Sequence, residues 1–309
     1  MPDVNTLFQK ASRLHQKGRL QDARKLYQQV LKLAPRFAAA LNMYGVLQAQ
    51  LGEFTAAVEP LKQAIKLEPN NIAAHQNLAR AYMALRQFTQ AQTCYERALK
   101  IDPGSYAALS GLGGALMLQS KFVDALGAFT RAQARKPDDP RLYLNLGTVL
   151  TQLGQVDAAI ENYRKVFSLQ PGSVDAHGCL GQLYLQQQEF ALAEEHFLRA
   201  VELGAEKPEI EIGLAEALEK RGKEELAGQH YFRAAELDPQ SQQAYTRLDE
   251  FMLRSGGDEK AEFLKRLASD HVYPDWSEAA SDARKLAAMY RYPDRSVLDT
   301  LNEFLADYE

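Results

Sequence analysis

Residues 143–171 read YLNLGTVLTQLGQVDAAIENYRKVFSLQP and predict two amphipathic helices joined by a short turn. In the first half, apolar or small residues recur at the spacing of one helix face, at Tyr143, Leu146, Gly147 and Leu150. After a break at Gly154, a second stripe follows at Val156, Ala159, Ile160, Tyr163 and Val166. Pro171 and Gly172 end this second helix, because proline cannot donate the helical hydrogen bond and restricts the residue before it.

The same pattern returns every 34 residues along most of the chain. Prolines keep this spacing at Pro35, Pro69, Pro103, Pro137, Pro171 and Pro239, and Ala205 takes the one missing position. Small residues stand at the middle of successive first helices, at Gly45, Ala79, Gly113, Gly147, Gly181 and Ala215. A fixed period of this length predicts a stack of similar two-helix units, each covering the apolar face of its neighbour. The small residues then mark where a first helix approaches its second helix closely.

This pattern resembles the tetratricopeptide repeat family, in which Leu-Gly in the first helix is followed by Ala, Phe or Tyr, and Pro. The resemblance covers about three quarters of the chain in seven consecutive copies. It implies an all-α fold, a right-handed superhelical solenoid of antiparallel helix pairs. Residues 4–241 are expected to form the seven repeats. Residues 242–309 are expected to form a degenerate eighth repeat and C-terminal capping helices.

The composition limits the possible partners and locations. The formal net charge is −4, but residues 1–150 carry 19 Lys and Arg against 10 Asp and Glu, while residues 151–309 carry 17 against 30. This asymmetry indicates either drift across solvated faces or a rod whose ends attract opposite charges. The basic half lacks interleaved aromatic residues and dense arginine clusters, so nucleic acid is not expected as a partner.

No stretch approaches the roughly 18 consecutive apolar residues of a membrane span. We therefore expect no membrane insertion and a cytoplasmic protein.

The resemblance also implies where a ligand binds. In this family the first helices line a concave groove that holds an extended peptide or a helix of a partner protein. The positions that match the family's groove residues are Asn42, Gln76, Asn77, Arg80, Met83, Met117, Arg141, Asn145, Thr148, Gln182 and Glu216. Asn77 and Asn145 fall where the repeat domain of O-linked N-acetylglucosamine transferases carries an asparagine ladder that grips peptide backbone. The alternative is that both are tolerated, exposed polar residues.

No catalytic, metal-binding or cofactor-binding residue is predicted. His75 and His177 occupy aromatic positions of first helices, and packing explains them. Gly111, Gly113 and Gly114 resemble part of a dinucleotide loop, but they lie within a predicted helix with no strand before it. We therefore expect a non-enzymatic scaffold or adaptor. The alternative is the substrate-recognition arm of a larger bacterial glycosyl-, sulfo- or methyltransferase, whose catalytic domain lies beyond Glu309 or on a partner.

The end of the chain has a different pattern. After Pro293, an apolar stripe is formed by Val297, Leu298, Leu301, Phe304, Leu305 and Tyr308. This stripe predicts a helix that either packs on the last repeats as a cap or docks another subunit. Because exposed charges contribute only ~0–1 kcal/mol per pair, we expect a monomer or a weak homodimer.

Overall fold

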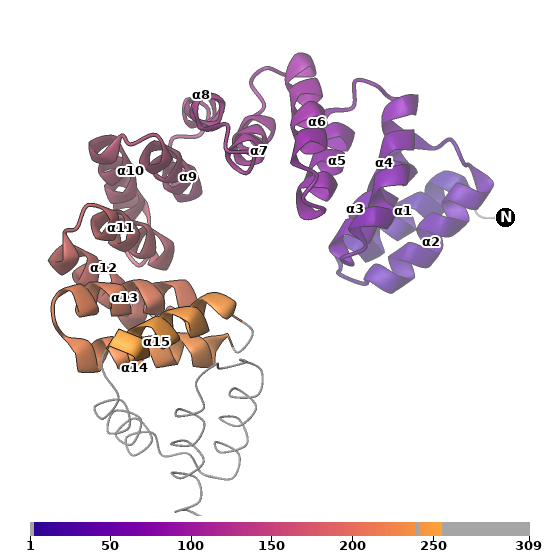
Figure 1. The fold of residues 1–309 in the computed structure, drawn as a ribbon. Helices are drawn as coiled ribbons and strands as arrows, with labels where there is room; N and C mark the ends of the chain where they lie inside the picture. Colours follow the sequence, from indigo (N-terminus) through magenta and orange to yellow (C-terminus); the bar gives the residue numbers. More distant parts are fainter. Residues whose placement is uncertain (1–2, 239–240, 255–309) are drawn as a thin grey trace, which may run out of the picture. The chain divides into compact units, whose positions relative to one another are not determined.

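The computed structural model describes residues 3–238 and 241–254, and these residues form fifteen helices and no strand (Figure 1). The all-α class is therefore confirmed. The helices in order are α1 Val4–Gln16, α2 Leu20–Leu33, α3 Ala38–Gln50, α4 Phe54–Leu67, α5 Ile72–Ala84, α6 Phe88–Ile101, α7 Tyr106–Met117, α8 Phe122–Gln133, α9 Pro140–Gln152, α10 Val156–Leu169, α11 Val174–Gln186, α12 Phe190–Glu202, α13 Pro208–Lys220, α14 Glu224–Leu237 and α15 Gln242–Arg254.

The stretch 143–171 forms the pair α9 and α10, as its spacing predicts. Asp139 caps the N-terminus of α9, since its side chain accepts a hydrogen bond from the backbone N–H of Arg141. Pro140 then stands at the first helical position, where a missing N–H costs nothing. The second helix ends at Leu169, two residues before Pro171.

Each pair turns through one residue in the left-handed backbone region. Four of these residues are glycines with positive φ, namely Gly18, Gly52, Gly154 and Gly222. Three others at the same place in the repeat are Arg86, Ser120 and Gln188, with φ of 57°, 59° and 61°. The turn geometry is therefore kept even where the sequence has no glycine.

The first and second helices of a pair also approach each other closely at the small residue, as predicted. A Cβ placed on Gly147 would lie 2.5 Å from Cε1 of Tyr163, a side chain that is 2% exposed. The equivalent distances are 2.6 Å from Gly113 to Phe129, 2.6 Å from Gly45 to Leu61 and 2.8 Å from Gly181 to Phe197. The first helix thus packs directly on the large side chain at the centre of the second.

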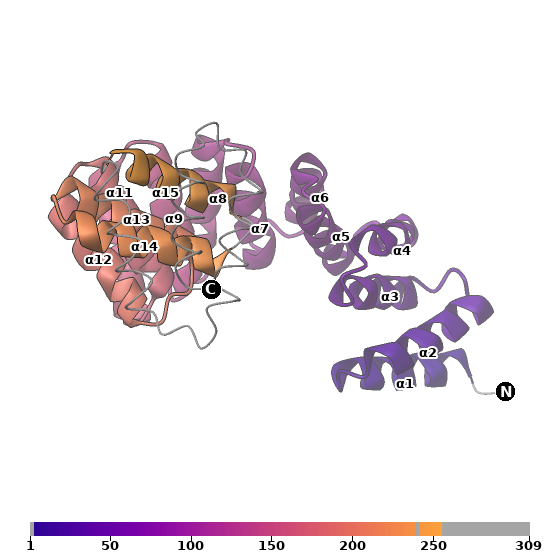
Figure 2. The same ribbon diagram turned by 60° about the horizontal axis from the view of Figure 1, so that its bottom comes forward.

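The chain divides into two compact units, Met1–Cys179 (unit 1) and Leu180–Glu309 (unit 2), with the boundary inside α11. In unit 1 each first helix packs on its own second helix, as for α1 with α2 and α5 with α6 in Figures 1 and 2. Successive first helices also touch one another, from α1 through α9, whereas successive second helices touch much less. The first helices therefore lie on the inner side of the curve within unit 1.

Unit 2 continues the same packing order. Helix α13 packs on α12 and α14, and α15 packs on both α13 and α14. None of the helices in the described residues combines the length and the hydrophobicity of a membrane-spanning segment. The assignment of residues 4–241 to seven repeats and 242–309 to an eighth repeat with a cap stays a prediction. The apolar stripe from Val297 to Tyr308 lies outside the described residues.

Candidate functional site

The first helices of unit 1 from α1 to α9 contain no acidic residue. The sequences of α1, α3, α5, α7 and α9 contain no Asp or Glu, and they carry four cations: Lys10, Arg13, Arg80 and Arg141. Between Val4 and Leu169, the carboxylates lie on second helices or in the connections; the next first helix, α11, carries Asp175. The face formed by α3, α5, α7 and α9 is called the inner face below.

Three of the predicted groove residues form a connected polar group on α3 and α5. Asn77 Nδ2 donates to Asn42 Oδ1 at 2.9 Å, and Arg80 donates to Asn77 Oδ1. Asn42 and Asn77 are half-buried, whereas Arg80 is exposed. An amide has two N–H donors and a carbonyl with two lone pairs, so each asparagine keeps further hydrogen-bonding capacity.

The centre of the inner face is lined by small and flexible side chains. On α5, Gln76 donates to Ser105 Oγ at 2.8 Å, which links it to the residue before α7. Met83 and Met117 are both half-buried. A Cβ placed on Gly114 would meet only Met83 Cε, at 4.0 Å, so this part of α7 is open.

At the start of α9, a buried carboxylate orients an exposed arginine. Asp139 is 4% exposed and accepts a hydrogen bond from Tyr106 Oη at 2.7 Å. Arg141 also donates to it, from Nη2 at 3.3 Å, and Lys136 Nζ lies 3.8 Å away. Burial alone would raise the pKa of Asp139, but the hydrogen bonds from Tyr106 and Arg141 outweigh it and lower the pKa.

The two remaining predicted residues on α9 differ from each other. Thr148 Oγ1 donates to the carbonyl of Leu144 at 3.0 Å and accepts from Tyr163 Oη at 3.4 Å. Thr148 therefore contributes to packing within the repeat. Asn145 is half-buried and makes no hydrogen bond to another described side chain.

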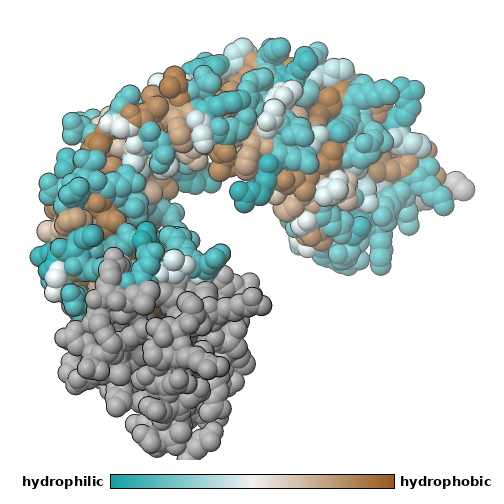
Figure 3. Space-filling model, in the orientation of Figure 1, coloured by the Kyte–Doolittle hydropathy of each residue, from teal (hydrophilic) through white to brown (hydrophobic). Residues whose placement is uncertain are grey.

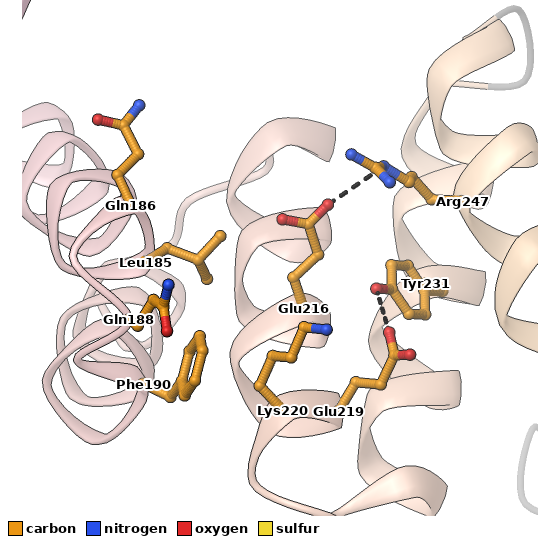
Figure 4. A pocket seen from close by; sticks show the side chains of 9 residues that line it. All are labelled: Leu185, Gln186, Gln188, Phe190, Glu216, Glu219, Lys220, Tyr231 and Arg247. Atoms are coloured by element: carbon orange, nitrogen blue, oxygen red, sulfur yellow. Dashed lines mark hydrogen bonds and ion pairs between the residues drawn. The ribbon is translucent and has the colours of Figure 1, made fainter.

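Gln182 and Glu216 belong to unit 2, so they are described separately from the inner face. Gln182 is exposed on α11. Glu216 on α13 lines a hollow of about 650 Å³ (Figure 4). The residues around this hollow are Leu185, Gln186, Gln188, Phe190, Glu216, Glu219, Lys220, Tyr231 and Arg247.

Unit 2 also contains two buried carboxylates that the sequence analysis did not anticipate. Glu194 on α12 is 7% exposed and pairs with Arg221 Nη1 at 2.6 Å and Lys223 Nζ at 2.7 Å. Glu211 on α13 is fully buried between His230 and Arg233 of α14. The only indication in the sequence is that charged residues occupy apolar positions of these helices. Residues of opposite charge lie on the following helix or directly after it.

Two observations describe the potential metal ligands and one of the cysteines. Among the described residues, no group of three or more His, Cys, Asp and Glu is placed to hold a metal ion. Burial raises the pKa of the Cys94 thiol to about 11, so it stays protonated at neutral pH. On the visible surface, apolar residues are interspersed with hydrophilic ones (Figure 3).

A stack of two-helix units whose first helices form one face defines the class of helical repeat proteins. The sequence matches the tetratricopeptide repeat family at residues 8–72, 77–140, 144–208 and 180–242. The chain therefore belongs to the tetratricopeptide repeat family. Members of this family generally act as scaffolds that bind other proteins, and most are non-catalytic.

Three solved structures illustrate the shared fold. A tetratricopeptide repeat protein from Parabacteroides merdae is 17% identical, with a TM-score of 0.67 over 81% of this chain and 98% of that one. PilF from Pseudomonas aeruginosa is 21% identical, with a TM-score of 0.59 over 70% and 97% of the two chains. YrrB, described as a TPR protein with an unusual peptide-binding site, is 20% identical, with a TM-score of 0.50 over 58% and 92%. The sequence has no significant match among curated proteins.

Proposed function

We propose that unit 1 binds an extended segment of a partner protein along the inner face. The observation that carries this proposal is the composition of that face. Its helices present amides, methionines and arginines and no carboxylate, while the acidic residues between Val4 and Leu169 lie on the second helices and in the connections. Solvated faces of ordinary helices carry both signs of charge.

The polar groups of the inner face suit a peptide backbone. Asn42 and Asn77 already form a hydrogen-bonded pair, so their orientation is fixed before a ligand arrives. A peptide unit presents one donor and one acceptor, which an asparagine amide can pair with simultaneously. Asn145 on α9 offers a second amide of this kind.

The centre of the face suits side chains of the partner. Gly114 leaves α7 open, and the methionines on either side of it are flexible and polarizable. Such side chains adapt to different apolar guests, so we propose tolerance for the sequence of the bound segment at this point.

The charge of the face indicates a segment that is neutral or acidic. Arg80 and Arg141 are exposed, and the Arg141 guanidinium is positioned by the buried Asp139. Complementary charge mainly raises the association rate and the salt sensitivity of binding. In this proposal the protein is a non-catalytic adaptor in the cytoplasm and is a monomer or a weak homodimer.

The experiment uses peptides selected from a random phage-displayed library on the immobilised full chain. Asn77→Ala, Arg80→Ala and Asn145→Ala together should weaken binding of the selected peptides by about tenfold or more, because a hydrogen bond from the charged Arg80 alone contributes ~1.5–3 kcal/mol. Circular dichroism should show unchanged helix content, since none of the three side chains is fully buried.

A matched control places the same kinds of change on the second helices. Gln63→Ala, Gln90→Ala and Arg97→Ala remove two amides and one cation from exposed positions of α4 and α6. This control should leave affinity unchanged. Full affinity in the inner-face variant would show that the assignment is wrong.

A further inference from the structure

Arg80 on α5 is a cation that has an amide, and not a carboxylate, as its partner. Its Nη2 donates to Asn77 Oδ1, and Asn77 in turn donates to Asn42 on the neighbouring helix α3. The Arg80 side chain is exposed, and no carboxylate among residues 3–238 and 241–254 forms an ion pair with it. The guanidinium is therefore held at one edge by the amide and can donate further hydrogen bonds at the other.

Arg141 is held in a similar way at the start of α9. Its Nε and Nη2 donate to the Asp139 carboxylate at 3.4 and 3.3 Å. Asp139 is 4% exposed and also accepts from Tyr106, so it supports the arginine from below. The Arg141 side chain is 85% exposed, and the exposed Asp138 forms no ion pair with it. The Nη1 edge of this guanidinium is thus available to a ligand.

The surface between the two arginines is uncharged. Helix α7 lies between α5 and α9 and packs on both. Its sequence contains no charged residue, and only Met83 Cε comes within 4.0 Å of a Cβ placed on Gly114. An open helix surface beside a flexible methionine can accept an apolar side chain.

The separation of the arginines sets the spacing of the groups that both can bind. Neighbouring packed helices lie about 8–10 Å apart, which places α9 roughly 18 Å from α5. In the 34-residue period Arg141 corresponds to Ala73 of α5, which lies one half of that helix, or about 10 Å, before Arg80. The separation is therefore about 20 Å, and an extended chain that rises about 3.3 Å per residue covers it in roughly six residues.

We propose that the inner face selects an internal acidic segment with two side-chain carboxylates about six residues apart, one at Arg80 and one at Arg141, and an apolar residue between them over Gly114. Charge complementarity favours this guest, because α3, α5, α7 and α9 contain no carboxylate of their own. A free guanidinium edge binds a carboxylate through two parallel hydrogen bonds. The proposal rests on the proposed function and deepens it, since it names the kind of segment that the inner face binds.

Two synthetic peptides of identical composition test the spacing. Acetyl-Gly-Asp-Ser-Ser-Leu-Ser-Ser-Asp-Gly-amide (the spaced peptide) has its carboxylates at the proposed separation, and acetyl-Gly-Ser-Ser-Asp-Leu-Asp-Ser-Ser-Gly-amide (the close peptide) has them next to the leucine. Calorimetric titration of the full chain at low salt should give about fivefold tighter binding of the spaced peptide. Only this peptide reaches both arginines, and one further ion pair with bidentate geometry is worth about that factor at an exposed site.

Variants assign the preference to the two arginines. Arg80→Gln and Arg141→Gln should each remove most of the preference for the spaced peptide, since either change leaves a single oriented guanidinium. Both side chains are exposed, so circular dichroism should show unchanged helix content. Arg97→Gln removes an exposed cation from the second helix α6, and this matched control should keep the full preference.

Equal affinity for the two peptides, no measurable binding of either, or an unchanged preference in Arg80→Gln or Arg141→Gln would overturn the proposal. A third peptide, the spaced peptide with Asn for both Asp and a free C-terminal carboxylate, tests a chain terminus as the source of the carboxylate. Tighter binding of this third peptide than of the spaced peptide would overturn the internal segment.

Failure of this proposal is distinguishable from failure of the proposed function. Library-selected peptides that depend on Asn77, Arg80 and Asn145 but lack the spaced carboxylates would overturn the acidic segment and leave the proposed function intact. Library-selected peptides that bind the triple variant with full affinity would contradict the proposed function itself.

Discussion

Two glycine-to-alanine substitutions should change stability in opposite directions. Gly147 on α9 is enclosed, since an added Cβ would lie 2.5 Å from Cε1 and 2.8 Å from Cδ1 of Tyr163. Nonbonded carbons prefer a separation of about 3.5–4.0 Å, so the ring would have to move by roughly 1 Å. Tyr163 is 2% exposed, so a movement of its ring would displace the side chains that bury it.

The size of the effect follows from two opposing contributions. Overpacking a core costs about 1–3 kcal/mol, whereas replacing a glycine within a helix by alanine gains about 0.5–1 kcal/mol. From the midpoints of these two ranges, Gly147→Ala should lower the free energy of unfolding by about 1 kcal/mol. Gly127 on α8 has no atom within 4 Å of an added Cβ, so Gly127→Ala should raise the free energy of unfolding by about 0.5–1 kcal/mol.

Urea denaturation followed by circular dichroism gives the comparison directly, with both variants and the parent chain measured side by side. The midpoint should fall for Gly147→Ala and rise for Gly127→Ala. If Gly147→Ala raises the midpoint as much as Gly127→Ala, α9 and α10 are not packed as closely as the structure has them, and the reasoning is refuted.

Two further predictions concern the turn and the Asp139 cluster. Arg86→Gly should raise the urea midpoint. The left-handed conformation costs a residue with a side chain ~1–2 kcal/mol, whereas the additional backbone entropy that glycine loses on folding costs only ~0.5–1 kcal/mol. A lower midpoint would contradict this prediction. Burial, together with the hydrogen bond to Asp139 and its charge, raises the pKa of Tyr106 from 10.0 to about 12. The stability that this shift contributes is fully present below pH 10 and is lost as the pH rises through about 12. Thermal unfolding across this range should therefore decline more steeply for the parent chain than for Tyr106→Phe, and parallel curves would exclude the linkage.

The repeat fold could be predicted from the sequence because its determinants are local and recur. Spacing gives the helix faces, and residue size gives the close approach, as Gly147 and Tyr163 illustrate. Even the turn at Arg86 follows from its position in the period, although arginine does not itself favour a positive φ.

The details of the candidate site could be predicted only in part. The period places Asn42 near Asn77, but which atoms pair depends on side-chain torsions that no pattern specifies. Asp139 was not anticipated as the partner of Arg141, although an Asp-Pro pair at the start of a helix is a capping signal that could have indicated it. The hollow beside Glu216 depends on Arg247, a side chain two helices further along the chain.

The extent of a single binding surface along the repeats cannot be predicted from the sequence period. Nine of the eleven predicted groove residues belong to unit 1, whereas Gln182 and Glu216 belong to unit 2. Repeat contacts are mainly with neighbouring repeats, so a period by itself does not determine how far a single binding surface extends.

The central claim is that the inner face of unit 1 holds a peptide, and methionine methyl resonances report on it directly. The chain has six methionines, of which Met83 and Met117 lie on α5 and α7 of this face and Met252 lies on α15. Chains labelled at the methionine methyl groups are titrated with a selected peptide to saturation. We predict that the Met83 and Met117 resonances shift while that of Met252 does not; a saturated complex in which Met83 and Met117 are unchanged would contradict the claim.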